Sequence, residues 1–383
     1  MTDQAERPRR GGFLSFERQL RITFALGLGL AVVYAALIIR SADATGTLGY
    51  DYLAYDLAVD RLLAGQPLYD ANAQEFGPFG LFFYPPPFLL LVLPVALLPQ
   101  ELAIWTWTAL LTAVSVIGIV LMPVSRRTRW LVLLLAALSW PLVYAIKLGQ
   151  VGPVLLLLFA IGWRWMDRPW ALGVSAGLGT LIKLQPALLI GWAAVTNRRM
   201  AALIAVCVVA APPPLATLIA GPQAWLELAA LLGRVSRPLE TEFSYGIGRV
   251  LFAAGVPAEV ALLAHWANLA LVALVVVLTV LRGSAVAGYL AVVIATQFLS
   301  PVLWDHYALV LLVPVAWLVD RGRTWLAIVP LATSTPLLLA ELEVPLAYPL
   351  GFWLTLLAVA WEGGVLRTLR AQGNRASDGM LAA

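Results

Sequence analysis

Several polar side chains that can do chemistry stand at the edges of long apolar segments. The first is Asp51, which opens the stretch Asp51-Tyr52-Leu53-Ala54-Tyr55 after the first apolar run. A carboxylate held beside aromatic rings at such an edge can act as a general base, because partial burial raises its pKa toward a useful range. Asp51 can instead be the N-cap of the helix that follows it, or a solvated acid of a loop.

A cation lies deep in a later apolar run. Lys183 falls near the middle of the segment 170–194, and Pro186 follows it by three residues. If this segment spans a membrane, a lysine at that depth costs about 2.5–3.5 kcal/mol, so it normally faces a partner or a water-filled cavity. We therefore interpret Lys183 as a counter-charge for an anionic lipid phosphate. The alternative is a helix that ends near Pro186, from which the amine reaches the membrane surface.

A third polar cluster, Trp304-Asp305-His306-Tyr307, follows Ser300-Pro301 between two short apolar runs. A histidine beside an aspartate can donate to a phosphate or orient a base. The same residues can instead be an aromatic anchor at a membrane interface. Further candidates for phosphate or sugar contacts are Arg249 and the segment Lys147-Leu148-Gly149-Gln150, and each can also be only part of a loop.

The composition indicates the setting of these groups. The chain has 383 residues, of which 61% are hydrophobic and 12% charged, whereas about 25% are charged in a soluble domain. The apolar runs do not alternate as β-barrel strands do, so we predict an all-α polytopic membrane protein. One cysteine excludes a disulfide framework, and two histidines exclude a histidine-rich metal site. There is no Walker loop, dinucleotide-binding glycine-rich turn or basic stripe for nucleic acid.

About twelve transmembrane helices are predicted, although ten or eleven are possible because several runs are short. A basic segment at 1–21 precedes a retained first helix at about 22–39. The further candidate spans lie at about 83–98, 101–122, 130–147, 150–166, 170–194, 200–220, 258–281, 285–303, 305–320, 325–341 and 346–366.

Two long polar loops separate these spans. The first, at 40–82, is acidic, and within it residues 51–64 are predicted to form a short amphipathic helix on the membrane. On that helix Asp56 and Asp60 fall on a solvated face that is separate from Asp51.

The distribution of arginines predicts the topology. The basic N-terminus is placed in the cytoplasm, and both the first loop and the second long loop, at 221–257, lie outside. The arginines at 126–129 disagree with twelve spans, which makes 83–147 the weakest part of this scheme. We expect a single membrane domain over 22–366 and a disordered cytoplasmic tail at 367–383.

Taken in chain order, the motifs resemble glycosyltransferase family 87, and they extend over most of the chain. They are Asp51-Tyr-x-x-Tyr55, Leu63-Ala-Gly65-x-Pro67-x-Tyr69-Asp70, Tyr84-Pro85-Pro86, Gly149-Gln150, Gly177-x-Gly179 with Lys183-x-x-Pro186, and Ser300-Pro301-x-x-Trp304-Asp305-His306.

The resemblance implies a GT-C-type helical bundle that takes a hexose, usually mannose, from a polyprenyl phosphate, as polyprenol-phosphate-mannose-dependent α-mannosyltransferases do. By the resemblance, Asp51 is the base that deprotonates the acceptor hydroxyl, His306 lies near the donor phosphate, and Lys183 occupies a basic position of the family motif. The expected contacts to donor phosphate and sugar are Lys183, His306, Arg249, Asp305, Gln150 and Tyr55. No metal and no cofactor are expected.

The implied reaction is a direct displacement on the extracytoplasmic side of a bacterial inner membrane, with a lipid or glycan hydroxyl as acceptor. A lipid or solute transporter or flippase is the alternative, because broken helices and an intramembrane lysine suit that class too. A non-catalytic membrane scaffold is a third possibility. A cavity that gathers Asp51, Lys183 and His306 favours the enzyme, whereas scattering them over separate surfaces contradicts it.

Overall fold

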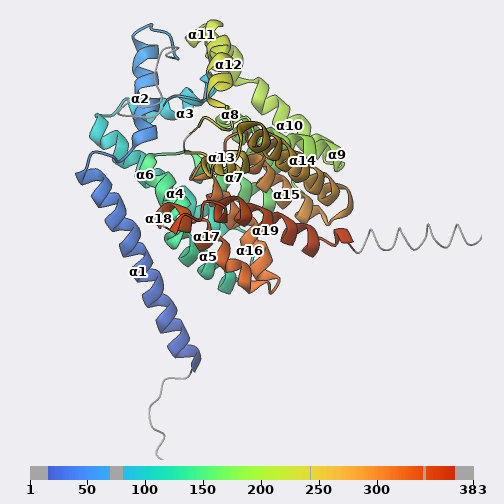
Figure 1. The fold of residues 1–383 in the computed structure, drawn as a ribbon. Helices are drawn as coiled ribbons and strands as arrows, with labels where there is room; N and C mark the ends of the chain where they lie inside the picture. The colour runs from blue at the N-terminus through green and yellow to red at the C-terminus, as the bar shows by residue number, and fades with distance from the viewer. Residues whose placement is uncertain (1–15, 70–80, 242, 340–341, 367–383) are drawn as a thin grey trace, which may run out of the picture.

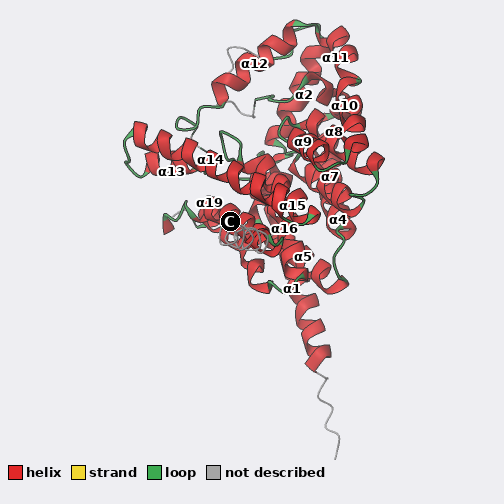
Figure 2. Ribbon diagram, turned by 90° about the vertical axis from the view of Figure 1, so that its right-hand side faces the viewer, coloured by secondary structure: helices red, strands yellow, loops and turns green. Residues whose placement is uncertain are grey.

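The computed structural model describes residues 16–69, 81–241, 243–339 and 342–366. Within these ranges the chain is helical and forms no strand, as Figure 2 shows, so the predicted all-α class is confirmed. Most of the predicted N-terminal segment, part of the first loop and the predicted C-terminal tail at 367–383 lie outside the described residues.

Figure 1 labels the α-helices in chain order. The elements from the N-terminus to the second long loop are α1 (Phe16–Ala44), α2 (Tyr50–Leu63), η1 (Pro86–Phe88), α3 (Leu89–Ala96), α4 (Gln100–Leu121), α5 (Arg126–Leu138), α6 (Trp140–Leu148), α7 (Gly152–Arg164), α8 (Pro169–Ile182), α9 (Ala187–Val195), α10 (Arg199–Ala210), α11 (Pro212–Ala220) and α12 (Gln223–Val235). The later elements are α13 (Ile247–Ala253), α14 (Ala258–Arg282), α15 (Ala285–Phe298), η2 (Tyr307–Leu311), α16 (Leu312–Asp320), η3 (Thr324–Ile328), α17 (Val329–Ala332), α18 (Thr335–Leu338) and α19 (Ala347–Glu362).

Four segments in the described part are long and apolar enough to cross a membrane, namely Arg21–Ala44, Gln100–Leu121, Arg199–Ala220 and Ala258–Arg282. A fifth is possible if α5 and α6, which meet at a bend of 60°, are one broken span. The chain is therefore polytopic. Several of the other predicted spans are shorter apolar helices, such as α7 and α8, so the number twelve is not established by length and composition.

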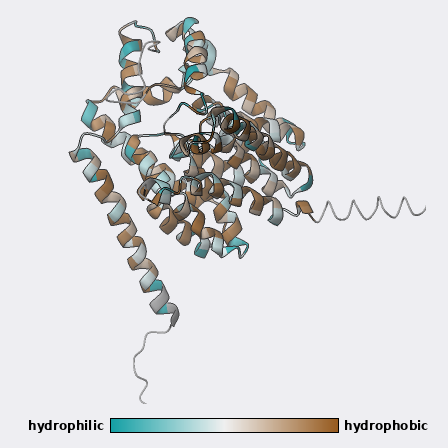
Figure 3. Ribbon diagram, viewed as in Figure 1, coloured by the Kyte–Doolittle hydropathy of each residue, from teal (hydrophilic) through white to brown (hydrophobic). Residues whose placement is uncertain are grey.

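The first helix projects beyond the bundle (Figure 1). It packs against α5 and α6 along one side, and only 6% of its apolar window is buried. Its exposed surface is mostly apolar, as the brown colour in Figure 3 shows, which suits contact with lipid chains. In both ribbon views α2, α11 and α12 gather at the end of the molecule opposite to the start of α1.

The predicted span 170–194 is interrupted at its centre. Helix α8 ends at Ile182, and α9 begins at Ala187. Lys183 has an extended backbone with φ −138° and ψ 144°, and Pro186 cannot donate a helical hydrogen bond. The predicted continuous helix at 170–194 is therefore wrong, whereas the alternative of a helix that ends near Pro186 agrees with the structure. Unwound backbone at such a depth is tolerated where it lines a cavity.

Two glycines hold α2 against the end of α6. Gly149 ends α6 in the left-handed region with φ 77°, and a Cβ there would lie 2.7 Å from the Cβ of Tyr52. The N–H of Gly49, which precedes α2 with φ 78°, donates to the Lys147 carbonyl at 2.8 Å. These contacts fix the first turn of α2, and with it Asp51, beside Gln150.

The predicted helix at 51–64 is confirmed as α2, but its environment differs from the prediction. Six of its residues are buried, including Tyr52, Tyr55 and Asp56, so α2 is packed into the protein instead of lying freely on a membrane surface. Asp56 is only 9% exposed, whereas Asp60 is exposed. Tyr52 packs against Trp107, and Tyr55 packs against Phe88, which buries this face of α2. Hydrophobic periodicity alone does not show these contacts.

Candidate active site

A cavity of about 550 Å³ opens beside the start of α2. It brings together six of the seven predicted site residues, which come from segments far apart in the sequence. They are Asp51 and Tyr55 of α2, Gln150 between α6 and α7, Lys183 between α8 and α9, and Asp305 and His306 before η2. This gathering is the arrangement that the enzyme hypothesis required.

Asp51 lies in the first turn of α2 and outside the helices that are long enough to span the membrane. Burial raises the pKa of its carboxyl to about 7, although the side chain retains some exposure toward the cavity. A hydrogen bond from the Gln150 amide and the charge of Lys183 oppose this rise, whereas the charge of Asp305 adds to it. A carboxyl with such a pKa is suited to accept a proton near neutral pH.

A chain of hydrogen bonds orients the group that contacts Asp51. The Tyr55 hydroxyl donates to the Tyr84 hydroxyl at 2.9 Å, and Tyr84 donates to Oε1 of Gln150 at 2.8 Å. The Gln150 carbonyl is thereby occupied, so its amide N–H groups are left to face the Asp51 carboxylate. This chain connects Tyr55 and Gln150 to the carboxylate and is suited to position it, while their contacts to the donor stay a prediction.

We expect Gln150→Leu to lower the rate of the reaction about 10- to 100-fold at pH 7, because a hydrogen bond to a charged group contributes about 1.5–3 kcal/mol. Loss of that bond also raises the pKa of Asp51, so the pH at which the rate is half-maximal shifts upward. Rate–pH profiles of purified variants test both effects. Gln223→Leu, at an exposed position of α12, is the matched control, and identical profiles for both variants would contradict the positioning role.

Lys183 provides a positive charge in the same cavity as Asp51. Its Nζ lies 4.5 Å from the centroid of the Tyr307 ring and interacts electrostatically with Asp51. No carboxylate of the described residues forms an ion pair with it within 4.0 Å. The amine is therefore available to neutralise an anionic ligand.

His306 is almost completely buried and presents one ring nitrogen to the cavity. Its Nδ1 lies 3.1 Å from Oδ1 of Asp305, and no described residue partners its Nε2. The Tyr348 hydroxyl holds this turn, because it contacts the carbonyls of Trp304 and Asp305 and accepts the N–H of Ala308. With Nδ1 donating to Asp305, Nε2 accepts from a sugar hydroxyl when the ring is neutral and donates to a phosphate when it is protonated.

Arg249 is the predicted residue that does not line the cavity. It lies on α13, where its guanidinium is 6.0 Å from the Phe252 ring centroid. The segment before it does reach the site, since the N–H of Tyr245 donates to the Leu303 carbonyl at 2.7 Å. The helical turn of α13 directs Arg249 elsewhere, and the geometry gives no support to its role as a donor contact.

Lys147, in the segment that was a candidate for phosphate or sugar contacts, lines the cavity, as does Lys183, the other lysine of the chain. Two residues that support the site were not predicted as functional groups. Tyr84 had a signal, since a tyrosine that precedes three prolines at the start of an apolar run is unusual for a lipid-facing position. Tyr348 had none, because its contacts join α19 to a turn that lies 40 residues away.

The site shows carboxylate, amide, amine and imidazole groups around one cavity, with no nucleophilic thiol. Within the described ranges no group of three His, Cys, Asp or Glu side chains is arranged to hold a metal ion. The chemistry that these groups can perform is proton removal by Asp51 and binding of an anion by Lys183 and His306 in the same cavity.

Comparison with known protein families defines the class. The model of glycosyltransferase family 87 matches residues 82–304, which is more than half of the chain. The chain therefore belongs to glycosyltransferase family 87, as the order of its motifs indicated. The match includes Gln150 and Lys183 but begins after Asp51.

Two curated proteins of Mycobacterium tuberculosis are similar to the chain. A polyprenol-phosphate-mannose-dependent α-(1-2)-phosphatidylinositol mannoside mannosyltransferase is 28% identical over 288 residues, which cover 66% of each chain. A polyprenol-phosphate-mannose-dependent α-(1-2)-phosphatidylinositol pentamannoside mannosyltransferase is 29% identical over 264 residues, covering 65% of this chain and 61% of that protein. The matched region thus spans slightly less than two thirds of the length of these relatives.

Proposed function

We propose that the protein is a membrane glycosyltransferase that moves a hexose from a polyprenyl phosphate to the hydroxyl of a lipid or glycan. The observation that carries this proposal is the single cavity that Asp51, Lys183 and His306 line together. A base and an anion site in one cavity match the two ends of a displacement reaction. Mannose is the proposed sugar, because the two relatives are named for polyprenol-phosphate-mannose.

The proposed reaction is one in-line displacement. The acceptor oxygen attacks the anomeric carbon, the bond between that carbon and the phosphate oxygen breaks, and Asp51 takes the proton from the acceptor. The polyprenyl phosphate leaves with the bonding electrons, and its growing negative charge is stabilised by the cation of Lys183, in the cavity that His306 also lines. Attack from the opposite face turns a β-linked donor into an α-linked product.

The proposed location is a bacterial inner membrane, with the cavity on the extracytoplasmic side. Asp51 follows the C-terminal end of α1 closely, since α1 ends at Ala44 and α2 begins at Tyr50. The other end of α1 carries Arg18 and Arg21, which the positive-inside rule assigns to the cytoplasm. A helix that crosses once then places Asp51 outside.

An assay with labelled donor tests this function. Membranes that contain the full chain are supplied with polyprenyl-phosphate [¹⁴C]mannose and a total lipid extract as acceptor. We expect label to appear in a new lipid or glycan, with one free polyprenyl phosphate per sugar transferred. A transporter, the second candidate class, moves the donor across a sealed vesicle and leaves it intact. Intact donor after translocation would overturn the transferase proposal.

The pH dependence follows from the raised pKa of Asp51, which burial brings to about 7. Below that value the carboxyl is protonated and cannot accept the acceptor proton. We expect the rate to fall about tenfold per pH unit below pH 7 and to level off above it. Initial rates between pH 5 and 9 test this expectation. A rate that stays constant down to pH 5 would show that Asp51 keeps an ordinary pKa or is not the base.

A further inference from the structure

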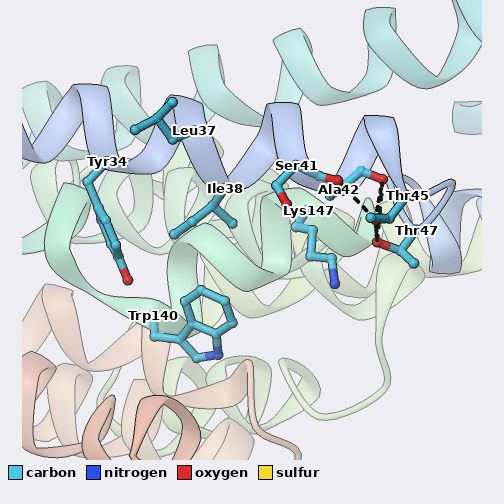
Figure 4. Close-up of a pocket in the computed structure, with 9 residues that line it drawn as sticks. All are labelled: Tyr34, Leu37, Ile38, Ser41, Ala42, Thr45, Thr47, Trp140 and Lys147. Atoms are coloured by element: carbon cyan, nitrogen blue, oxygen red, sulfur yellow. Dashed lines mark hydrogen bonds between the residues drawn. The ribbon is translucent and has the colours of Figure 1, made fainter.

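A second hollow of about 380 Å³ lies between α1 and α6 (Figure 4). On α1 it is lined by one stripe that includes Tyr34, Ile38, Ser41 and Thr45. These residues follow one another at spacings of three or four, so they lie on one face of the helix. The stripe rises about 16 Å from end to end. Leu37 and Ala42 lie beside this stripe and also line the hollow, which therefore follows the axis of α1 as a groove.

The groove changes from apolar to polar along its length. Figure 4 shows Tyr34 and Trp140 at one end, and Lys147, Thr45 and Thr47 at the other. At the polar end the hydroxyls of Thr45 and Thr47 lie 3.1 Å apart. The side chains at the first end match a hydrocarbon chain, whereas hydroxyls and an amine match an anionic head group.

The polar end of the groove meets the reaction cavity. Thr47 and Lys147 line both hollows. The Lys147 backbone is fixed there, because its carbonyl accepts the N–H of Gly49 at the start of α2. A molecule that lies along α1 with its head at Lys147 therefore places that head at the mouth of the cavity that holds Asp51.

Lys147 carries a charge that forms no ion pair among the described residues. Its Nζ lies 5.3 Å from the centroid of the Tyr144 ring and interacts with Asp305 at longer range. Within the described part of the chain no carboxylate lies within 4.0 Å of it. An anionic head group would supply the missing partner.

We propose that this groove binds the first isoprene units of a polyprenyl phosphate and that Lys147 pairs with its phosphate. A polyprenyl phosphate has one chain joined directly to its phosphate, which matches a groove whose apolar part leads straight to a lysine. A diacyl phospholipid has a glycerol between its chains and its phosphate, which fits this order less well. The inference rests on the proposed function, because it names the path by which the donor enters that site.

Photo-crosslinking tests the groove without any transfer step. The full chain in phosphatidylcholine nanodiscs is irradiated with a polyprenyl phosphate that carries a diazirine in its first isoprene unit, and the labelled peptides are mapped by mass spectrometry. We expect labels between Tyr34 and Thr45 and between Trp140 and Lys147, removed by unlabelled polyprenyl phosphate but not by phosphatidic acid. Labels confined to other helices, or equal competition by phosphatidic acid, would overturn the proposal.

Variants separate the chain-binding part from the phosphate-binding part. We expect Ile38→Trp to fill the groove and reduce labelling about tenfold, while Val32→Trp, at a 54% exposed position on the opposite face of α1, leaves it unchanged. We expect Lys147→Met to weaken binding of the probe about tenfold or more, and Lys147→Arg to retain most of it. Unchanged labelling of Ile38→Trp and Lys147→Met would exclude the groove.

The two proposals can fail separately. If the wild-type chain transfers sugar but is never labelled in the groove, the proposed function stands and the entry path is wrong. If the groove is labelled as expected but no donor is consumed, the binding site stands and the transferase proposal fails. Because mapping uses the unmodified chain, a variant that does not fold leaves the test intact.

Discussion

Asp51→Asn is expected to reduce sugar transfer about 100- to 10,000-fold, which is the usual contribution of a general base. The amide keeps the size of the carboxyl and can still accept from the Gln150 amide through its oxygen, but it cannot take a proton from the acceptor. The variant should fold, because exchanging a buried carboxyl for an amide leaves no unpaired charge. The measurement is the initial rate with a labelled polyprenyl-phosphate sugar, together with the thermal unfolding midpoint.

The control for this variant lies on the same helix. Asp60→Asn makes the same chemical change at an exposed position of α2, and it should keep the wild-type rate. We also expect the dependence on pH near 7 to disappear from the residual activity of Asp51→Asn. Full activity in Asp51→Asn would remove Asp51 from the role of base. A large loss in Asp60→Asn would show instead that the charge of α2 as a whole matters.

Lys183→Met is expected to lower the rate about 100- to 1,000-fold, the effect of removing one group that stabilises charge in a transition state. The apolar side chain retains the packing on Tyr307 but offers nothing to the departing phosphate. The charge of Lys183 also lowers the pKa of Asp51. Its loss should therefore move the half-maximal rate to higher pH, a shift that a defect in packing alone does not produce.

Lys183→Arg is the matched control for the charge. It should restore the pH profile and part of the rate, because guanidinium carries the same charge in a different shape. A further check is the division between kcat and KM, since stabilisation of the leaving group acts on kcat. If Lys183→Met changes only KM and leaves the pH profile unaltered, Lys183 holds the ground-state donor without assisting its departure.

The sequence by itself determined the class of the fold and most of the site. Apolar runs with few charges impose helices, because unpaired backbone groups are too costly in lipid. Burying a polar or charged side chain is costly, so Asp51, Lys183 and His306 stood out in the sequence against the apolar residues around them. Of these three, Lys183 lies within residues 82–304, the region that the family model matches. The helix at the start of the first loop was predicted within a residue or two.

Only the tertiary structure decided how these groups meet. The break at Lys183 lies between α8 and α9, beside the cavity. The hydrophobic periodicity of 170–194 does not predict it. The role of Gln150 depends on Tyr84, which occupies its carbonyl from a segment 66 residues away. Hydrophobic patterns specify which face of a helix is buried, but they do not specify which other segment packs against that face.

Arg249 and Lys147 show that the local sequence around a cation does not determine whether its side chain reaches the cavity. Both are single cations beside glycine-rich turns, so local sequence gives them similar weight. The packing of α6 against α1 and α2 brings Lys147 to the cavity, while α13 directs Arg249 toward Phe252. Charge and spacing therefore identify which residues can act on a phosphate. Long-range packing sets the direction of each side chain, and so it determines whether that residue can reach a phosphate in the cavity.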